Sequence, residues 1–428
     1  MLSIEYQQMK KHLLLTTVSA LIAFGSTFAQ SHQCGTHIKM QEQLSLYPEL
    51  IDTRNQINEF TERWISDNKN NLSNRAVEII PVVVHVVYSS ESQNISTAQI
   101  QSQIEILNED YSGTNADVSG VPSVWTSLVA NTEIQFELAT CNPDGYHTNG
   151  ITRTSTIVTN WNGSDNVKYT SEEGHDAWPA TDYLNIWICN IGSGLLGYAY
   201  QPGINASLDG VVIGYRYFGL DSQSSTYDLG RTATHEIGHY FNLDHPWGPA
   251  GSNANCNFSD QVGDTPTQAE PNYGCNNSYP LESCGTGINS DMFNNFMDYG
   301  NDECLFFFTN GQKSRMLAAL NGPRASLKSS NGLSSCPVGI EDHILESSLL
   351  IYPNPTAEFI NIQSDQADNI ISEIRILDMV GRELLVQSNI KLGYAAIQLD
   401  VSELSKGAYV LEISSEHQRV SRKINILD

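Results

Sequence analysis

The chain has 428 residues, of which 40% are hydrophobic and 16% charged, so it is long enough and apolar enough to fill two folded cores. Its 48 acidic residues outnumber its 22 basic residues, and the net charge of −26 argues against nucleic acid or an anionic membrane as a partner. The eight cysteines include no Cys-x-x-Cys pair, which favours disulfides in an exported protein over a thiolate zinc site.

The first 29 residues are expected to be a secretory signal peptide. Two lysines precede an apolar run that ends in small residues at Ala29, after which cleavage is predicted. No later stretch is apolar over the length of a bilayer, so we expect no transmembrane anchor in the mature chain. Residues 30–75 are polar, with one helical stretch between residues 40 and 64, and are interpreted as a propeptide.

A domain of residues 76–336 is predicted to begin where the composition changes at Val77. Residues 79–88 are dense in β-branched side chains and predict a buried strand, and residues 96–111 have the caps and apolar spacing of a helix. Further strands are expected at residues 134–138, 183–188 and 211–215. These segments predict an α/β (α+β) unit in which a helix lies behind a twisted mixed sheet.

One short stretch, residues 234–245, contains three imidazoles and a carboxylate. His235 and His239 are four residues apart and share one face of a helix, so both can bind a single zinc ion. Glu236 is spaced to act on water as a general base, and His245 supplies a third ligand once the helix has ended. Three protein ligands leave one position open, which is typical of catalytic rather than structural zinc.

The alternative is a chance match, because His-Glu-x-x-His is a short motif. The chain has 11 histidines among 428 residues, so another histidine at one fixed position has a chance rate of only about 0.03. The third histidine therefore favours the catalytic interpretation.

The region between this motif and residue 304 is rich in Asn, Gly, Asp and Cys and has few apolar residues to bury. Its four cysteines allow three pairings, and disulfides or calcium held by oxygen ligands are expected to order it. Residues 337–347 are interpreted as a linker. The short alternating strands of residues 348–428 predict a small all-β sandwich.

The histidine motif resembles the signature of the metzincin metallopeptidases, His-Glu-x-x-His-x-x-Gly-x-x-His with a downstream Met-turn. Asn242 stands where that family has Gly, and Asn is the other residue that best tolerates the positive φ of such a turn. Residues 295–299, Asn-Phe-Met-Asp-Tyr, resemble the Met-turn of the pappalysin (cytophagalysin) branch. The resemblance implies that Met297 forms the floor beneath the zinc and that Tyr299 hydrogen-bonds the oxyanion. The alternative is that both are ordinary core residues.

The same resemblance assigns two further parts of the site. Cys34 begins a Cys-Gly-Thr stretch that resembles the cysteine switch of pappalysin precursors, in which a thiolate takes the open zinc position. The alternative is a disulfide. Leu196, Gly197 and Tyr198 correspond to the upper rim of the cleft, where an exposed strand pairs with extended substrate. The alternative is a plain glycine-rich loop.

The resemblance also implies two disulfides in the cysteine-rich region, Cys256 with Cys284 and Cys275 with Cys304. It implies calcium there as well, and the candidate ligands are Asp260, Asp264 and Thr267. The alternative is that these three are solvated loop residues. The sequence leaves three cysteines without an assigned pairing: Cys141, Cys189 and Cys336.

Some family members cleave before Arg or Lys by means of an acidic residue that follows the Met-turn. Asp302 and Glu303 occupy that region, and Glu303 is the predicted substrate-binding residue. A preference for Arg or Lys on the carboxyl side of the scissile bond is therefore expected, together with autoprocessing at the Asn74-Arg75 bond.

The carboxyl-terminal residues resemble the sorting domain of type IX secretion, in the Tyr-Pro-Asn-Pro at 352–355 and the Gly-Ala-Tyr-Val at 407–410. This implies export across the outer membrane of a Gram-negative bacterium, with the domain then removed or used for attachment. A carbohydrate-binding or adhesive module is the alternative, but no aromatic platform is evident.

Together these features predict a secreted zinc endopeptidase that is made as a latent zymogen and acts on proteins or peptides. The competing hypothesis is a surface adhesin that keeps a structural metal site. Glu236 argues against the adhesin, because a structural site needs no general base.

Overall fold

The computed structural model describes residues 33–69, 76–220, 226–249, 255–285, 291–336, 349–364, 369–392, 395–415 and 419–427. The predicted signal peptide, the linker at 337–347 and the Asn74-Arg75 bond lie outside these ranges. The chain divides into two compact units, Met1–Ala139 with Gly150–Leu333 and Thr140–Asn149 with Ser334–Asp428. The exact domain boundaries drawn from the sequence stay predictions.

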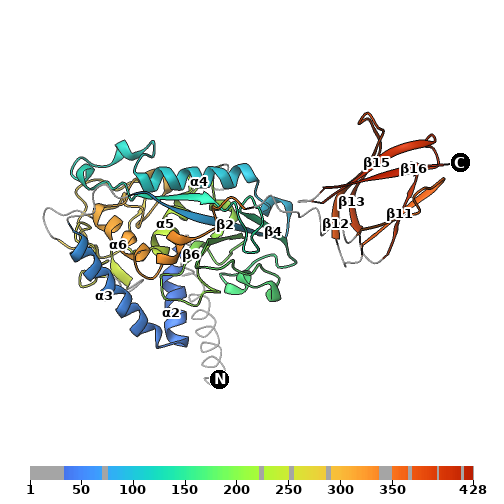
Figure 1. Ribbon diagram of the computed structural model, residues 1–428. Helices are drawn as coiled ribbons and strands as arrows, with labels where there is room; N and C mark the ends of the chain where they lie inside the picture. Colours follow the sequence, from blue (N-terminus) through green and yellow to red (C-terminus); the bar gives the residue numbers. More distant parts are fainter. Residues whose placement is uncertain are drawn as a thin grey trace, which may run out of the picture. The chain divides into compact units, whose positions relative to one another are not determined.

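A seven-stranded sheet forms the centre of the first unit (Figure 1). Its strands lie in the order β1-β6-β7-β5-β2-β3, and β4 pairs with the other end of β2. Their bounds are Gln33–Cys34 (β1), Glu78–Tyr88 (β2), Ile134–Leu138 (β3), Ile151–Ser155 (β4), Leu184–Cys189 (β5), Leu195–Ala199 (β6) and Val211–Gly214 (β7). Only the β6–β7 pair is antiparallel among these strands, so the expected mixed sheet is confirmed.

Helices α4 (Thr97–Ser112) and α5 (Arg231–Tyr240) pack on one face of this sheet. Alternate residues of β2, from Ile80 to Val86, are fully buried in the core that the sheet shares with them. The other face carries a second core that includes Trp187 and Tyr198. Both faces of β2 are therefore covered, which explains why its sequence is a continuous apolar run.

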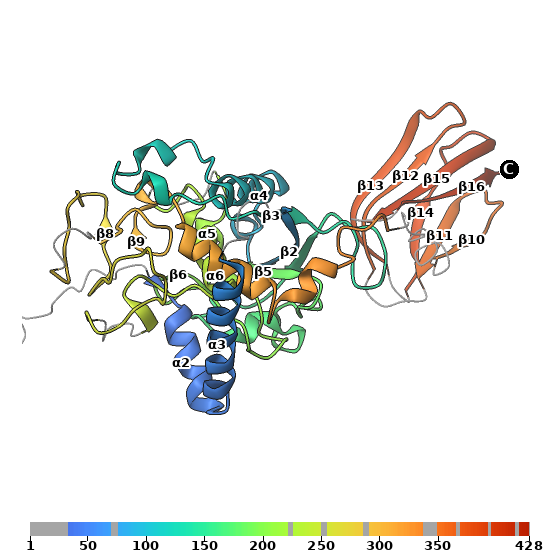
Figure 2. The same cartoon turned by 60° about the vertical axis from the view of Figure 1, so that its left-hand side comes forward.

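The N-terminal segment, residues 33–69, folds as β1 and two helices, α2 (Thr36–Leu46) and α3 (Leu50–Asn68). The sequence predicted one helical stretch here. The break lies at Tyr47, whose backbone leaves the helical region (φ −132°, ψ 78°) because Pro48 follows. Helix α3 contacts α6 (Asn310–Leu320) and lies next to it in two views (Figures 1 and 2).

The long loops after α5 are joined by a short parallel pair, β8 (Tyr273–Gly274) and β9 (Tyr299–Gly300). Disulfides link Cys256 to Cys284 and Cys275 to Cys304, the two pairs that the family resemblance implied. A third disulfide links two cysteines that the sequence left unassigned, Cys141 and Cys336. Cys34 and Cys189 are free thiols, and both are buried.

Two antiparallel sheets make up the second unit, with their apolar side chains in one shared core. One sheet contains β10 (Leu349–Tyr352), β11 (Phe359–Ser364) and β14 (Ile397–Asp400). The other contains β12 (Asn369–Leu377), β13 (Glu383–Leu392), β15 (Gly407–Ser415) and β16 (Arg419–Ile426). This confirms the predicted small all-β sandwich.

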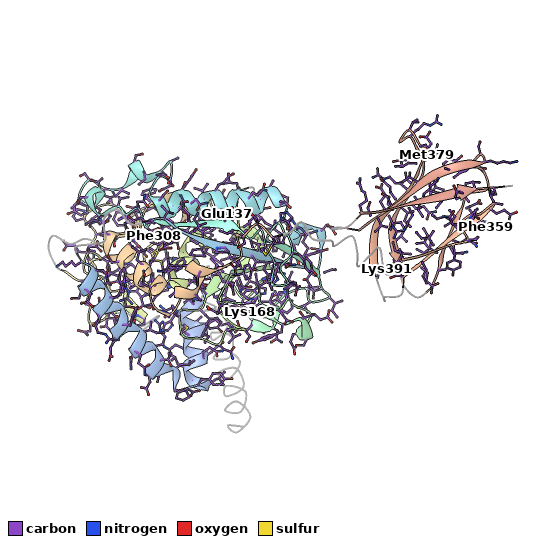
Figure 3. All side chains as sticks on the ribbon, viewed as in Figure 1. Glu137, Lys168, Phe308, Phe359, Met379 and Lys391 are labelled. Atoms are coloured by element: carbon purple, nitrogen blue, oxygen red, sulfur yellow. A yellow bond between two sulfur atoms is a disulfide. The ribbon has the colours of Figure 1, made fainter. Side chains whose placement is uncertain are left out.

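Side chains fill the interior of each unit (Figure 3). Phe308 is buried in the main core of the first unit, whereas Met379 is exposed on the second. Among the described residues, no helix combines the length and the apolar character needed to cross a membrane.

Candidate metal centre

Three imidazoles converge at the carboxyl end of α5. His235 and His239 lie one turn apart on this helix, and His245 returns to them after the helix ends. The three Nε2 atoms are 3.0 to 3.2 Å from one another. The return depends on a tight turn at Asn242, whose φ is +71° and whose side chain is fully buried. This left-handed conformation is the one expected where the metzincin signature has Gly.

Hydrogen bonds determine which nitrogen faces inward in the rings of His235 and His239. Nδ1 of His235 donates to the C=O of Phe296 (2.7 Å), and Nδ1 of His239 donates to the C=O of Leu243 (2.8 Å). Since a carbonyl only accepts, the proton of these two rings lies on Nδ1 and the Nε2 lone pairs point at the other imidazoles. Burial lowers the pKa of all three histidines, that of His239 to about 4, so the rings are neutral near pH 7.

This arrangement fits a tetrahedral metal ion. The facing lone pairs of His235 and His239 have no proton to share, so a cation between the rings satisfies both, and the Nε2 atom of His245 is placed to join them. Ligand nitrogens at the usual zinc distance of about 2.1 Å from a tetrahedral ion lie about 3.4 Å apart, close to the separation seen here. The donor set of three imidazoles matches the preference of a catalytic site with one open position.

The carboxylate of Glu236 is buried beside the histidines. Its Oε2 atom accepts hydrogen bonds from the Thr36 hydroxyl (2.8 Å) and from the Cys34 thiol (3.4 Å). Burial raises the pKa of Glu236 to about 7. A carboxylate with a pKa near neutrality is suited to take up a proton and to release it again within one reaction.

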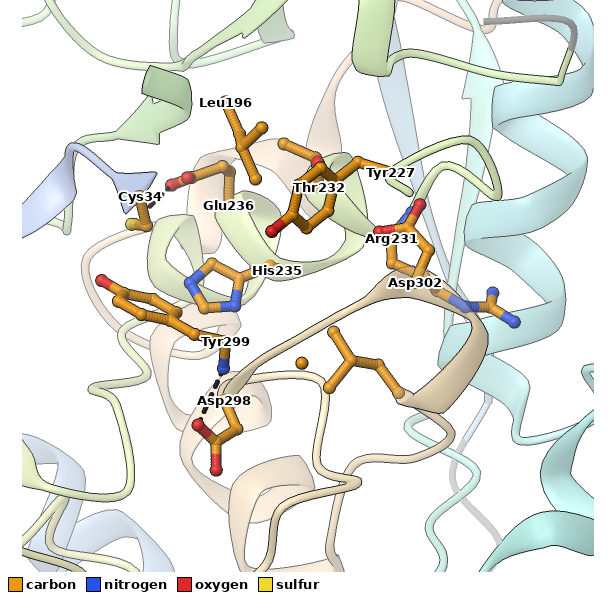
Figure 4. A pocket seen from close by; sticks show the side chains of 12 residues that line it. Cys34, Leu196, Tyr227, Arg231, Thr232, His235, Glu236, Asp298, Tyr299 and Asp302 are labelled. Atoms are coloured by element: carbon orange, nitrogen blue, oxygen red, sulfur yellow. Dashed lines mark hydrogen bonds between the residues drawn. The ribbon is translucent and has the colours of Figure 1, made fainter. Parts of the chain in front are cut away.

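Strand β1 brings Cys34 to this carboxylate. It pairs in parallel with the edge of β6, where Cys34 lies opposite Gly197 and the N–H of Gly35 donates to the C=O of Gly197 (2.8 Å). The Cys34 sulfur and one ring nitrogen from each of the three histidines lie within 4.8 Å of one another. Figure 4 shows Cys34 and Glu236 on the same side of His235. A thiol and three imidazoles thus form one potential ligand set.

The floor and one wall of the centre are apolar or aromatic. Met297 is fully buried, and its sulfur packs against Gly238. A Cβ atom added to Gly238 would lie only 2.4 Å from that sulfur. The ring of Tyr299 lies 4.9 Å from that of His245, Trp247 stacks on His245 at 4.5 Å, and the rings of Trp247 and Tyr299 are themselves 4.9 Å apart. Burial, followed by the nearby Cys34 and Glu236, raises the pKa of Tyr299 well above its usual value, so this phenol keeps its proton.

A pocket beside Glu236 lies at the amino-terminal end of α5 (Figure 4). Its lining includes Leu196, Tyr227, Thr232, Leu305 and two aspartates, Asp298 and Asp302. Asp302 accepts the N–H groups of Leu229 (2.9 Å) and Arg231 (3.2 Å), and burial raises its pKa to about 7.

The other candidate, Glu303, lies on the same short turn but is exposed and does not line this pocket. Arg231, although it borders the pocket, extends its guanidinium to Asp110 and Asp117. Of the two acidic candidates that follow the Met-turn, Asp302 is therefore the one that lines this pocket, together with Glu236 and Asp298.

Comparisons with known proteins agree with this geometry. Residues 168–321 match the family model described as pregnancy-associated plasma protein-A, a peptidase family. An extracellular metalloprotease of Arthroderma otae is 31% identical over 317 residues, which cover 72% of this chain and 97% of the relative. One of Colletotrichum graminicola is 31% identical over 322 residues, with the same two coverages. The chain belongs to this family of metallopeptidases.

Solved structures of mirolysin from Tannerella forsythia resemble the chain as well. The mature enzyme in complex with a cleaved peptide is 45% identical with a TM-score of 0.57, and the match covers 60% of this chain and 97% of that one. A promirolysin mutant is 40% identical with a TM-score of 0.61, over 69% of this chain and 96% of the other. These matches confirm the predicted metzincin-like fold of the catalytic domain.

Membership of this family makes the chain a metal-dependent peptidase, as the sequence predicted, and removes the competing adhesin hypothesis. Residues 350–427 match the model of a secretion system C-terminal sorting domain. The predicted sorting domain is thereby confirmed at the level of its family.

The candidate calcium residues do not converge in the way that the histidines do. Asp260 accepts from the Thr265 hydroxyl (2.6 Å) and the N–H of Val262, and Asp264 accepts from the Thr309 hydroxyl (2.7 Å) and the N–H of Gly311. No cluster of three metal-ligating side chains forms around them in the part of the chain that is described. Their hydrogen bonds order the loop and the start of α6.

Two residues that approach catalytic groups were not singled out from the sequence. Thr36 donates to Glu236 and accepts the N–H of Ala199 (2.8 Å), which ties the carboxylate to the edge of β6. Its position two residues after Cys34 was the available signal. Trp247 stacks on His245, and its signal was an aromatic residue close behind the third histidine.

Proposed function

We propose that the chain is a secreted zinc endopeptidase that is made as a latent precursor. The observation that carries the proposal is the convergence of three neutral imidazole nitrogens beside a buried carboxylate whose pKa is near 7. Three nitrogen donors with one further position favour zinc over calcium or magnesium, which prefer oxygen ligands.

His235, His239 and His245 would hold the zinc, which would supply a Lewis acid to polarise the scissile carbonyl and acidify water. Glu236 accepts the proton of the attacking water and passes it to the leaving amine. Tyr299 donates a hydrogen bond to the developing oxyanion, and a single donor of this kind contributes roughly 2 to 4 kcal/mol. The upper rim at Leu196, Gly197 and Tyr198 pairs with the backbone of the substrate. Met297 supports the histidines from below.

Latency follows from the contacts of β1. Cys34 would be a fourth ligand in the precursor, and a dication between the imidazoles would favour its thiolate even though burial raises the pKa of the free thiol. The Thr36 hydroxyl binds the carboxylate that must accept a proton. Removal of the propeptide, by cleavage at Asn74-Arg75, would free both the open position and the base.

We extend the proposal to a preference for Arg or Lys on the carboxyl side of the scissile bond. The support is the carboxylate of Asp302 in the pocket beside Glu236. Asp302 takes the place of Glu303 in this proposal, because Glu303 is exposed. A guanidinium or ammonium group in this pocket would meet a partly desolvated carboxylate.

The proposal also covers export by type IX secretion to the medium or the surface of a Gram-negative cell, supported by the sorting domain at residues 350–427. Calcium near Asp260, Asp264 and Thr267 is proposed on the family resemblance alone. A melting temperature that does not respond to calcium or to a calcium-selective chelator would refute this proposed calcium site.

Cleavage profiling of the processed protein with a peptide library, with and without chelator, tests the function. We expect chelator-sensitive cleavage before Arg and Lys, and metal analysis should find about one zinc per chain. The matched variant is Glu236→Ala, which should keep its zinc and lose hydrolysis. Zinc-free active enzyme would refute the metal assignment, and equal cleavage before all residues would refute the specificity.

A further inference from the structure

Asn242 has a second role besides its left-handed backbone. Its buried side-chain amide is bound at both ends by helix α3 of the N-terminal segment. Oδ1 accepts from the guanidinium of Arg54 (2.8 Å), and Nδ2 donates to the hydroxyl of Thr61 (3.4 Å). A glycine, which the metzincin signature has at this position, would offer neither group. The departure from that signature is therefore matched by contacts from α3.

Arg54 inserts its guanidinium between two parts of the first unit. Nη1 donates to the C=O of Pro202 (2.9 Å), while Nη2 donates to Asn242 as described. Burial lowers the pKa of Arg54 to about 10, and the acidic group that opposes this shift is Asp244. It is held in place by the Nε2 atom of Gln201, which donates to Asp244 (2.7 Å) and to the C=O of Leu243 (3.0 Å).

These acceptors select a guanidinium rather than any cation. Two oxygens from separate loops accept from the two terminal nitrogens of one planar fork, a geometry that the point charge of lysine does not reproduce. Arg315 and Arg324 also lie close enough to disfavour a further positive charge here. Binding at this site therefore depends on hydrogen-bond geometry more than on charge.

We propose that Pro202 and Asn242 form a guanidinium-binding site near the charge of Asp244, that Arg54 is its ligand in the precursor, and that this contact holds the N-terminal segment closed independently of Cys34. The inference rests on the proposed latent precursor and deepens it. Cys34 holds the segment at the edge of β6, and Arg54 holds it at the turn between the second and third histidines. Loss of either contact leaves the segment attached by the other.

The decisive experiment compares full-length precursors that carry Arg54→Gln, Arg54→Lys or Arg63→Gln. Arg63 is the matched control, because it lies on the same helix and its recorded hydrogen bond to the described residues goes to the C=O of Glu59 within that helix. All three substitutions lie in the segment that processing removes, so each precursor yields the same mature enzyme. The measured quantities are the rate of conversion to the mature form and the initial peptide hydrolysis by the unconverted precursor.

We expect Arg54→Gln to raise both rates on the order of tenfold, because hydrogen bonds from a charged group are lost. Arg54→Lys should lie in between, and Arg63→Gln should match the wild type. Equal conversion of Arg54→Gln and wild type, with mature enzyme active, would overturn this inference and leave the proposed function standing. The same acceleration by Arg63→Gln would also overturn it, since general loosening of α3 would then be the cause. Mature enzyme without chelator-sensitive activity would instead overturn the proposed function.

A substitution on the other side of the contact gives a second, independent measurement. Asn242→Gly keeps the φ of +71° available and removes the acceptor for Arg54. Precursor activity is expressed relative to the mature form of the same variant, so that any effect on catalysis cancels. In the Arg54→Gln background, Asn242→Gly should raise this relative precursor activity much less than it does in the wild-type background. Full additivity of the two effects would contradict a shared contact.

Discussion

Gly238→Ala changes the stability of the fold in two opposite ways. It favours the helix, and it overpacks the floor of the site. Gly238 lies inside α5 between Glu236 and the second histidine. Alanine in a helix interior is favoured over glycine by about 1 kcal/mol, so the helix alone would become more stable. A Cβ atom at this position would lie 2.4 Å from the sulfur of Met297 and 3.3 Å from its methyl carbon.

Overpacking outweighs the gain in helix propensity. Met297 is fully buried, so its sulfur has no free space to enter, and such overpacking costs about 1 to 3 kcal/mol. The net destabilisation is then up to about 2 kcal/mol, and each kcal/mol lowers the melting temperature by roughly 2 to 4 °C in a unit of this size. Activity should fall as well, because the histidines lie above Met297.

Thermal unfolding of Gly238→Ala in the wild-type and Met297→Ala backgrounds measures this directly. Met297→Ala removes the sulfur, so the same Gly238→Ala change should become stabilising there by about 1 kcal/mol. A rise in melting temperature in the wild-type background would refute the proposed steric contact. An equal fall in melting temperature in both backgrounds would also refute it.

Three further outcomes are expected. Removal of the metal by a chelator should abolish peptide hydrolysis. It should also lower the melting temperature, because the folded state loses a few kcal/mol of metal-binding free energy, and added zinc should restore both properties. Burial raises the pKa of Asp302 to about 7, so its charge develops as the pH rises from 6 to 8. The kcat/KM for a peptide with Arg after the scissile bond, relative to its Ala counterpart, should increase over this range in the wild type and stay flat in Asp302→Asn. Thr36→Val removes a hydrogen bond to Glu236 and leaves the N–H of Ala199 without its acceptor, at a cost of about 1 to 3 kcal/mol. The precursor should hydrolyse peptides faster before processing, and a precursor rate equal to that of the wild type would count against the contact.

Local periodicity was sufficient to predict the arrangement of the histidines. The spacing of His235 and His239 fixes their common face on any helix, and a turn at Asn242 follows from the need to bring His245 back. Strand β2 was equally predictable, because a run of β-branched residues covered on both faces has few alternatives. In both cases the residues that interact are close in sequence or share one pattern.

Contacts between distant segments were not predictable in this way. Asp302 and Glu303 are adjacent, and it is Asp302 that accepts the main-chain N–H groups of Leu229 and Arg231, which lie about 70 positions away in the sequence. The contact between Arg54 and Asn242 joins residues 188 positions apart through a single side-chain amide. No periodic pattern in either segment encodes such a pair, since one polar residue on a polar helix is usually solvated.

The edge of β6 gives a second physical basis for the proposed latency of the precursor. β1 pairs with β6 through Gln33 and Cys34, opposite Leu195 and Gly197. An edge strand has one row of free N–H and C=O groups, so an extended substrate cannot pair with β6 while β1 is bound to it. Exclusion of substrate from this edge therefore does not require the thiol to bind a metal ion. A Cys34→Ser precursor should for this reason keep part of its latency, as measured by peptide hydrolysis before processing, and complete loss of latency would show that the thiol alone closes the site.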